Sequence, residues 1–123
     1  MTILTILGGG AWGSALANLA TKNAHQVNLW SRRSSFELQS AIADTDVVVS
    51  AVSMKGVAAT VDRLLSTNLS PNTIIVTVTK GLDPATTRTP SQIWQTAFPR
   101  HPIVVLSGPN LSEEIRQELP AAT

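Results

Sequence analysis

The sequence predicts an α/β domain built on a doubly wound, mainly parallel sheet flanked by helices. Short apolar runs alternate with stretches of helical periodicity along the chain, which is typical of parallel strands joined by crossover helices. The run Asp46–Val52 is nearly all apolar, as expected for a strand that is covered on both faces. A glycine-rich turn at residues 8–13 joins the first apolar run to the first helical stretch.

Each expected element has its own signal. Apolar residues recur at helical spacing in Val57–Leu65, a turn sequence at residues 70–72 precedes the fourth strand, and Asn110 with Glu113 resembles a capping box. The expected strands are Thr2–Leu7, Gln26–Trp30, Asp46–Val52, Thr73–Thr79 and Ile103–Leu106. The expected helices are Trp12–Asn23, Glu37–Ala43, Val57–Leu65, Thr89–Phe98 and Leu111–Leu119.

Length and composition fit one folded domain. The chain has 123 residues, of which 43% are hydrophobic and 14% charged, and its formal net charge is +1. This balance gives no reason to expect nucleic acid or a membrane surface as a partner, and no apolar run approaches the roughly 20 residues that span a bilayer. The absence of cysteine excludes disulfides and thiolate metal sites. We therefore expect a cytoplasmic protein without a metal site, with His25 and His101 at the surface because neither has a partner at metal-ligand spacing.

The turn at residues 8–13 has the spacing of a dinucleotide-binding motif. Gly8, Gly10 and Gly13 form G-x-G-x-x-G between a strand and a helix, which is the context that this motif requires. Gly8 permits the tight turn, Gly10 lets the backbone approach a pyrophosphate, and Gly13 allows close packing of helix and strand. The phosphates would lie at the helix N-terminus, where free N–H groups and the helix dipole attract anions. The sequence thus predicts a Rossmann-like domain that binds a nucleotide, against the alternative of an ordinary flexible turn.

Two arginines follow the second strand, where an acid is usual in NAD-selective sites. Such sites place Asp or Glu about 20 residues after the glycines to bind the ribose 2′-OH. This chain has Arg32 and Arg33 there, and planar guanidinium groups suit a 2′-phosphate. The pattern favours NADP over NAD, against the alternative of a solvated pair in a loop.

Four further positions are weaker candidates. Trp12 lies inside the glycine turn, where it could cover the pyrophosphate or line the nicotinamide pocket, or pack in the core. Lys80 follows the fourth strand at the sheet edge where ligands bind, although a lysine there is often merely exposed; Lys55 has a similar, weaker argument. Gly108 leaves its backbone accessible before a helix N-terminus, or belongs to a simple capped loop.

With these residues in place, the chain resembles the N-terminal, cofactor-binding domain of bacterial-type NAD(P)-dependent glycerol-3-phosphate dehydrogenase. A tryptophan inside the glycine turn, T-K-G-L at residues 79–82 and S-G-P at residues 107–109 occur in that order. This combination is more specific than the glycine motif alone, and the resemblance spans essentially the whole chain.

The family reduces dihydroxyacetone phosphate to sn-glycerol 3-phosphate with NAD(P)H, which feeds phospholipid synthesis in the cytoplasm. The resemblance implies NADP(H) as cofactor, with NAD(H) as a second one, and allows a homodimer of the full-length enzyme. The implied cofactor contacts are Gly8, Gly10, Trp12, Gly13, Arg32, Arg33, Lys80 and Ser112. The implied substrate contacts are Lys80, Gly108 and Asn110.

Three departures from the family pattern bear on this expectation. Residues 1–123 are expected to be a fragment, because the family's helical catalytic domain and its proton-transferring lysine are absent from them. The stretch Ser34–Thr45 is shorter than usual, so the family pattern does not define the adenine side of the site in this chain. After the third strand, Ala51–Gly56 lacks the proline that is common in the family.

Two alternatives stay open at this point. One is the cofactor domain of a related dehydrogenase, of the 6-phosphogluconate or ketopantoate type, against which T-K-G-L combined with S-G-P counts. The other is a non-catalytic NADP(H)-binding module or remnant, which the absence of a catalytic domain from these residues favours.

Overall fold

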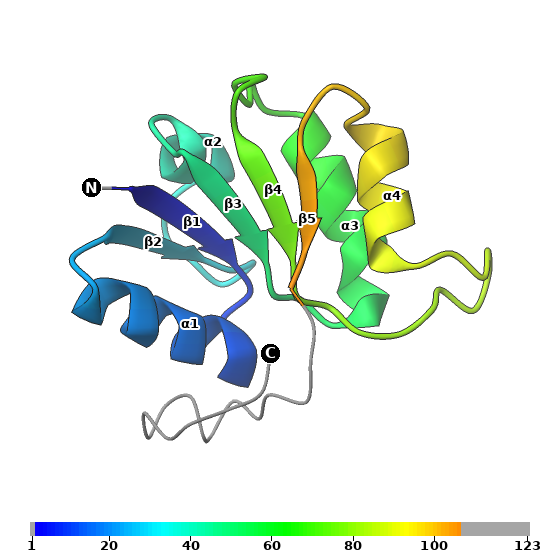
Figure 1. Ribbon diagram of the computed structural model, residues 1–123, viewed down its shortest axis with the longest axis horizontal. Helices are drawn as coiled ribbons and strands as arrows, with labels where there is room; N and C mark the ends of the chain where they lie inside the picture. The colour runs from blue at the N-terminus through cyan, green and yellow to red at the C-terminus, as the bar shows by residue number, and fades with distance from the viewer. Residues whose placement is uncertain (1, 107–123) are drawn as a thin grey trace.

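A five-stranded sheet organises the chain, and the computed structural model describes residues 2–106 of it (Figure 1). The strands are β1 (Ile3–Leu7), β2 (Gln26–Trp30), β3 (Val47–Ser50), β4 (Ile74–Thr77) and β5 (Ile103–Val105). They pair in the order β2-β1-β3-β4-β5, and each pair is parallel. The prediction of a doubly wound, mainly parallel sheet is therefore confirmed.

Four helices flank the described sheet: α1 (Ala11–Lys22), α2 (Leu38–Ile42), α3 (Met54–Leu65) and α4 (Pro90–Ala97). Each lies where the sequence predicts a helix, although α3 begins at Met54 rather than Val57. Thr89 and Gln92 form a capping box ahead of α4, whose first residue is Pro90. The helix expected at 111–119 and its capping residues lie outside the described residues. No helix within residues 2–106 is long and apolar enough to cross a membrane.

Strand ends differ from the expected ones where the neighbouring strand stops. The sequence predicts a third strand that continues to Val52, but β3 ends at Ser50, which pairs with Leu7 at the end of β1. Likewise the predicted fourth strand continues to Thr79, whereas β4 ends at Thr77, opposite Ser50. A strand ends where its backbone pairing with the neighbouring strand ends. An apolar sequence pattern needs no such partner, so it can continue past the last paired residue.

The main core lies between the sheet and the layer formed by α2, α3 and α4 (Figure 1). The apolar stripe of α3 faces it, as its spacing predicts. Trp94 of α4 is fully buried in this core, and its ring centroid lies 5.8 Å from that of Phe98. The fully buried members of this core are Leu7, Val48, Val57, Leu64, Ile75 and Trp94.

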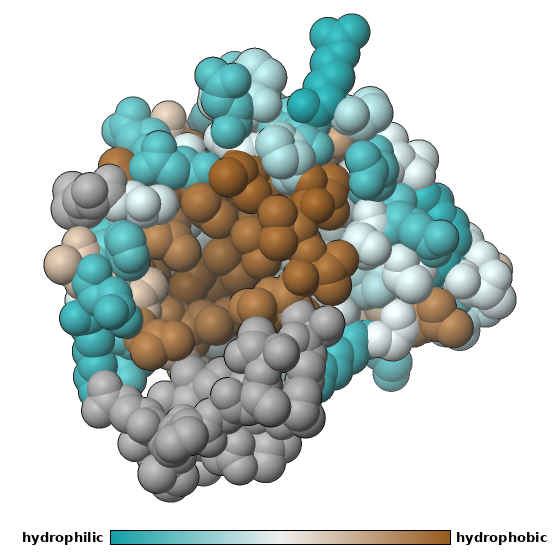
Figure 2. Space-filling model, in the orientation of Figure 1, coloured by the Kyte–Doolittle hydropathy of each residue, from teal (hydrophilic) through white to brown (hydrophobic). Residues whose placement is uncertain are grey.

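The opposite face of the sheet is covered by α1 over β1 and β2. Its buried residues are Ile6, Val49 and Val78, which pack with Leu16 and Ala17 of α1. Toward β4 and β5 this face leaves Ile74 and Val104 exposed, and Figure 2 shows apolar side chains gathered over the middle of the sheet.

Both histidines lie next to turns and are half-buried, neither in the core nor fully exposed. His25 Nδ1 accepts a hydrogen bond from the Thr2 N–H at 3.3 Å. His101 contacts the Ser70 carbonyl through Nε2 at 3.0 Å, and its ring packs edge-on against Phe98.

Candidate functional site

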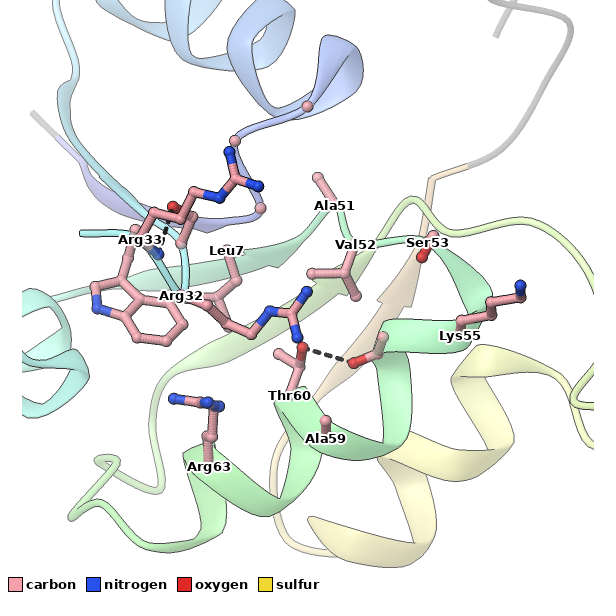
Figure 3. A pocket seen from close by; sticks show the side chains of 16 residues that line it. Leu7, Arg32, Arg33, Ala51, Val52, Ser53, Lys55, Ala59, Thr60 and Arg63 are labelled. Carbon is pink, nitrogen blue, oxygen red and sulfur yellow. Dashed lines mark hydrogen bonds between the residues drawn. The ribbon is translucent and has the colours of Figure 1, made fainter.

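A pocket with a volume of about 700 Å³ opens at the carboxyl ends of β1, β2 and β3 (Figure 3). Its walls are the glycine turn after β1, residues 30–33 at the end of β2 and in the turn that follows, residues 51–53 after β3, and one side of α3. Here the chain leaves β1 for α1 on one face and β3 for α3 on the other. Such a topological switch point is where open parallel sheets bind ligands.

Gly8 fixes the turn between β1 and α1. Its φ of +115° lies in a region that side chains with a Cβ rarely adopt. Its N–H donates to the Trp30 carbonyl at 2.8 Å, and a Cβ on Gly8 would lie 2.9 Å from the Ala51 carbonyl oxygen. The turn is thus held between the ends of β2 and β3, and only glycine fits there.

Gly13 and Gly10 differ in the space available for a side chain. A Cβ on Gly13 would lie 1.9 Å from the Gly8 carbonyl oxygen, so the first turn of α1 packs directly on the backbone of the turn. A Cβ on Gly10 would meet nothing within 4 Å. The tight turn and the close packing predicted from the motif are therefore confirmed, and the space next to Gly10 is open.

The N-terminus of α1 faces this open space without a side chain to cap it. Gly10 is the N-cap residue and makes no side-chain hydrogen bond, and the first turn of α1 contains no acidic residue. The first N–H groups of a helix have no partner within the helix. An anion beside Gly10 would find these donors and the positive end of the helix dipole.

Arg32 and Arg33 enter the same pocket from the turn after β2. Hydrogen bonds hold this turn, with the Ser31 N–H donating to Ser34 Oγ at 2.9 Å and the Arg33 N–H donating to Ser31 Oγ at 3.3 Å. Both arginines are exposed, and in Figure 3 Arg32 points toward Thr60 of α3 whereas Arg33 points toward the start of α1. The structure therefore brings together the glycine turn and the two arginines that the sequence singled out.

Trp12, Gly13 and Lys80 are not among the residues that line this pocket. Trp12 is half-buried in the first turn of α1, and Lys80 is exposed beyond the end of β4. The segment that carries Lys80 still lies at the same sheet edge, because Thr79 Oγ1 donates to the carbonyl of Val52 at 2.6 Å. Gly108, Asn110 and Ser112 lie outside the described residues.

One wall of the pocket is formed by α3, and of its residues the sequence pattern indicates only Lys55. Gly56, Ala59, Thr60 and Arg63 line it. Thr60 Oγ1 donates to the Gly56 carbonyl at 2.7 Å, which keeps this hydroxyl on the helix. Their spacing puts these four residues on one helical face, beside the apolar stripe. A face of small and polar residues on a helix that begins at the switch point is the signal that could have found them.

A model of a known family matches most of the chain. The family is described as NAD-dependent glycerol-3-phosphate dehydrogenase N-terminus, and the match covers residues 3–37 and 34–123.

Curated relatives and solved structures agree with this match. The chain is 58% identical over 122 residues to glycerol-3-phosphate dehydrogenase (NAD(P)+) of Trichormus variabilis, covering 99% of this chain and 40% of the relative. It is 57% identical to the enzyme of the same name from Acaryochloris marina, covering 99% and 39%. The fold superposes on glycerol-3-phosphate dehydrogenase from Coxiella burnetii with a TM-score of 0.88 at 23% identity, covering 98% of this chain and 45% of the other. The chain thus spans about two fifths of the length of its curated relatives.

Proposed function

This chain belongs to the family of NAD-dependent glycerol-3-phosphate dehydrogenase N-terminal domains, and we propose that it is the cofactor-binding half of an enzyme that reduces dihydroxyacetone phosphate to sn-glycerol 3-phosphate. The proposed cofactor is NADP(H), with NAD(H) as the weaker alternative. Relatives named glycerol-3-phosphate dehydrogenase (NAD(P)+) support this proposal.

A single observation carries the choice of cofactor: one pocket contains the glycine turn and the guanidinium groups of Arg32 and Arg33, and no carboxylate lines it among residues 2–106. The residues fit a dinucleotide. The open space beside Gly10 and the uncapped start of α1 suit a pyrophosphate. Arg32 and Arg33 suit a 2′-phosphate, whereas an acid at this place would favour the free ribose hydroxyl.

Each part of the chain has a proposed task in the whole enzyme. Gly8, Gly10, Trp12 and Gly13 contact the dinucleotide, and Lys80 and Ser112 also contact the cofactor. Lys80, Gly108 and Asn110 border the substrate, where a lysine ammonium neutralises the charge that develops on the substrate oxygen. NADPH supplies a hydride when bound. The group that transfers the proton belongs, on this proposal, to a helical catalytic domain outside residues 1–123.

Calorimetric titration of the 123-residue chain with NADPH and with NADH tests the proposal. We expect NADPH to bind more tightly than NADH, and we expect no turnover of dihydroxyacetone phosphate by this chain, because it holds only one side of the active site. Absence of binding by either cofactor would overturn the cofactor assignment. Robust reduction of the substrate by the same preparation would contradict the division of the site between two domains.

The proposal extends to the location and assembly of the whole enzyme. Both reactants are small, soluble phosphate esters, which supports a cytoplasmic location. We also propose a homodimer of the full-length enzyme, for which sedimentation analysis is the direct measurement.

A further inference from the structure

Arg63 lies over the ring of Trp30 on the wall of the pocket that α3 provides. Its guanidinium carbon is 5.8 Å from the centre of the indole ring, and both residues line the pocket. Trp30 is only 8% exposed, and its Nε1 donates to the Phe36 carbonyl at 3.0 Å, so the ring is held in place. A guanidinium at this distance from an indole face is attracted by the π-system. Arg63 therefore has a fixed platform that directs it along the pocket wall.

The charges around the pocket are all of one sign. Arg32 and Arg33 come from the turn after β2, and Arg63 and Lys55 come from α3. No carboxylate lines the pocket within residues 2–106 to offset them. Like charges in one pocket repel each other, and an anion bound between them would relieve that repulsion.

A simpler explanation accounts for the position of Arg63 in the sequence but not for its direction. Arg63 lies in the last turn of α3, where any cation interacts favourably with the helix dipole. That effect would be the same for a side chain that points into solvent. Contact with Trp30 instead holds this guanidinium against the indole face in the pocket, and Figure 3 shows Arg63 and Arg32 on different walls of it, α3 and the turn after β2.

We propose that Arg63 is a third cationic contact for the 2′-phosphate of NADP(H), and so a specificity-determining residue for NADP over NAD. This inference rests on the proposed function. Arg32 reaches the phosphate from the β2 side and Arg63 reaches it from the α3 side. A phosphate monoester with nearly two negative charges can accept hydrogen bonds from both guanidiniums at once. The unphosphorylated ribose of NAD offers neither the charge nor the acceptor oxygens.

The test compares R63A with the unchanged chain in titrations with NADPH and NADH, and with 2′,5′-ADP and 5′-AMP as fragments. We expect the Kd for NADPH and 2′,5′-ADP to rise about ten-fold in R63A, as for loss of one charge-assisted contact, and the Kd for NADH and 5′-AMP to change less than about two-fold. The salt dependence of NADPH binding should also become shallower. R100A is the matched control, because Arg100 is an exposed arginine that does not line the pocket.

The other outcomes are equally informative. Equal weakening of NADPH and NADH would overturn the proposal, because Arg63 would then act on a part that both cofactors share. Unchanged affinity for both would overturn it as well. If R63A lowers the melting temperature, R63Q makes the same comparison with an uncharged side chain that keeps more of the arginine's aliphatic stem than alanine does. Failure of the unchanged chain to bind NADPH would instead refute the proposed function, which separates the two failures.

Discussion

The two ends of the pocket are built in different ways. At the glycine end the backbone decides the geometry, because Gly8 is held between the Trp30 and Ala51 carbonyls and Gly13 packs on the turn itself. At the arginine end, exposed side chains extend from a short turn that is held by hydrogen bonds to Ser31. The glycine end is part of the packed fold, whereas the side chains of the arginine end are exposed on its surface. We therefore expect that changes at the glycine end alter stability and binding together, and that changes at the arginine end alter selectivity alone.

Gly13→Ala should have the largest effect. The added Cβ would lie 1.9 Å from the Gly8 carbonyl oxygen, and no side chain is available to move aside. We expect the free energy of unfolding to fall by about 3 kcal/mol or more, which is a large part of the stability of a small domain. Urea denaturation followed by tryptophan fluorescence measures this change.

Gly56→Ala is the matched control for that experiment. Its Cβ would be 3.4 Å from Val52 Cβ, an ordinary contact, and it would replace a glycine inside α3. We expect a gain of about 0.5 to 1 kcal/mol from helix propensity. A Gly13→Ala variant as stable as the unchanged chain would show that the glycine end tolerates more than its geometry suggests.

Removing both arginines should come next in size and should separate selectivity from stability. In the R32A/R33A double variant we expect the Kd for NADPH to rise about 100-fold, since two charge-assisted contacts are lost, with little change for NADH. The free energy of unfolding should change by less than about 0.5 kcal/mol, because both side chains are exposed. Titrations with NADPH and NADH measure the Kd values, and urea denaturation measures the free energy of unfolding. If NADPH affinity did not fall relative to NADH, the 2′-phosphate assignment would be wrong.

Gly10→Ala should have the smallest effect and should sharpen the comparison within the glycine end. Nothing lies within 4 Å of the added Cβ, so stability should stay within about 0.5 kcal/mol of the unchanged chain. Binding of NADPH and NADH should weaken equally, by about ten-fold, because the methyl group would occupy the space proposed for the pyrophosphate. Unchanged binding of both cofactors would place the pyrophosphate elsewhere.

The elements of the fold could be predicted because each leaves a local pattern. The second strand was predicted with the bounds that the structure shows, Gln26–Trp30, since turn residues delimit its apolar run. The ends of β3 and β4 were predicted too late, because pairing with β1 and with each other decides where they stop.

The candidate site was predictable only in part. Gly8, Gly10, Arg32 and Arg33 belong to segments whose spacing has a known physical meaning, and all four line the pocket. Arg63 could not be found in this way, because nothing local distinguishes it from any basic residue near a helix C-terminus. Its position over Trp30 depends on the path of α3 across the sheet.

The sequence by itself determined the fold class, the steric roles of Gly8 and Gly13 and the absence of an acid after β2, since periodicity, glycine spacing and residue charge are local properties. Only the tertiary structure decided that α3 forms a wall of the pocket and that Arg63 lies over Trp30 in the same pocket as the arginines of the β2 turn. The physical reason is the parallel sheet. It aligns the carboxyl ends of strands that are distant in sequence, and the helices that follow these strands then meet around one space.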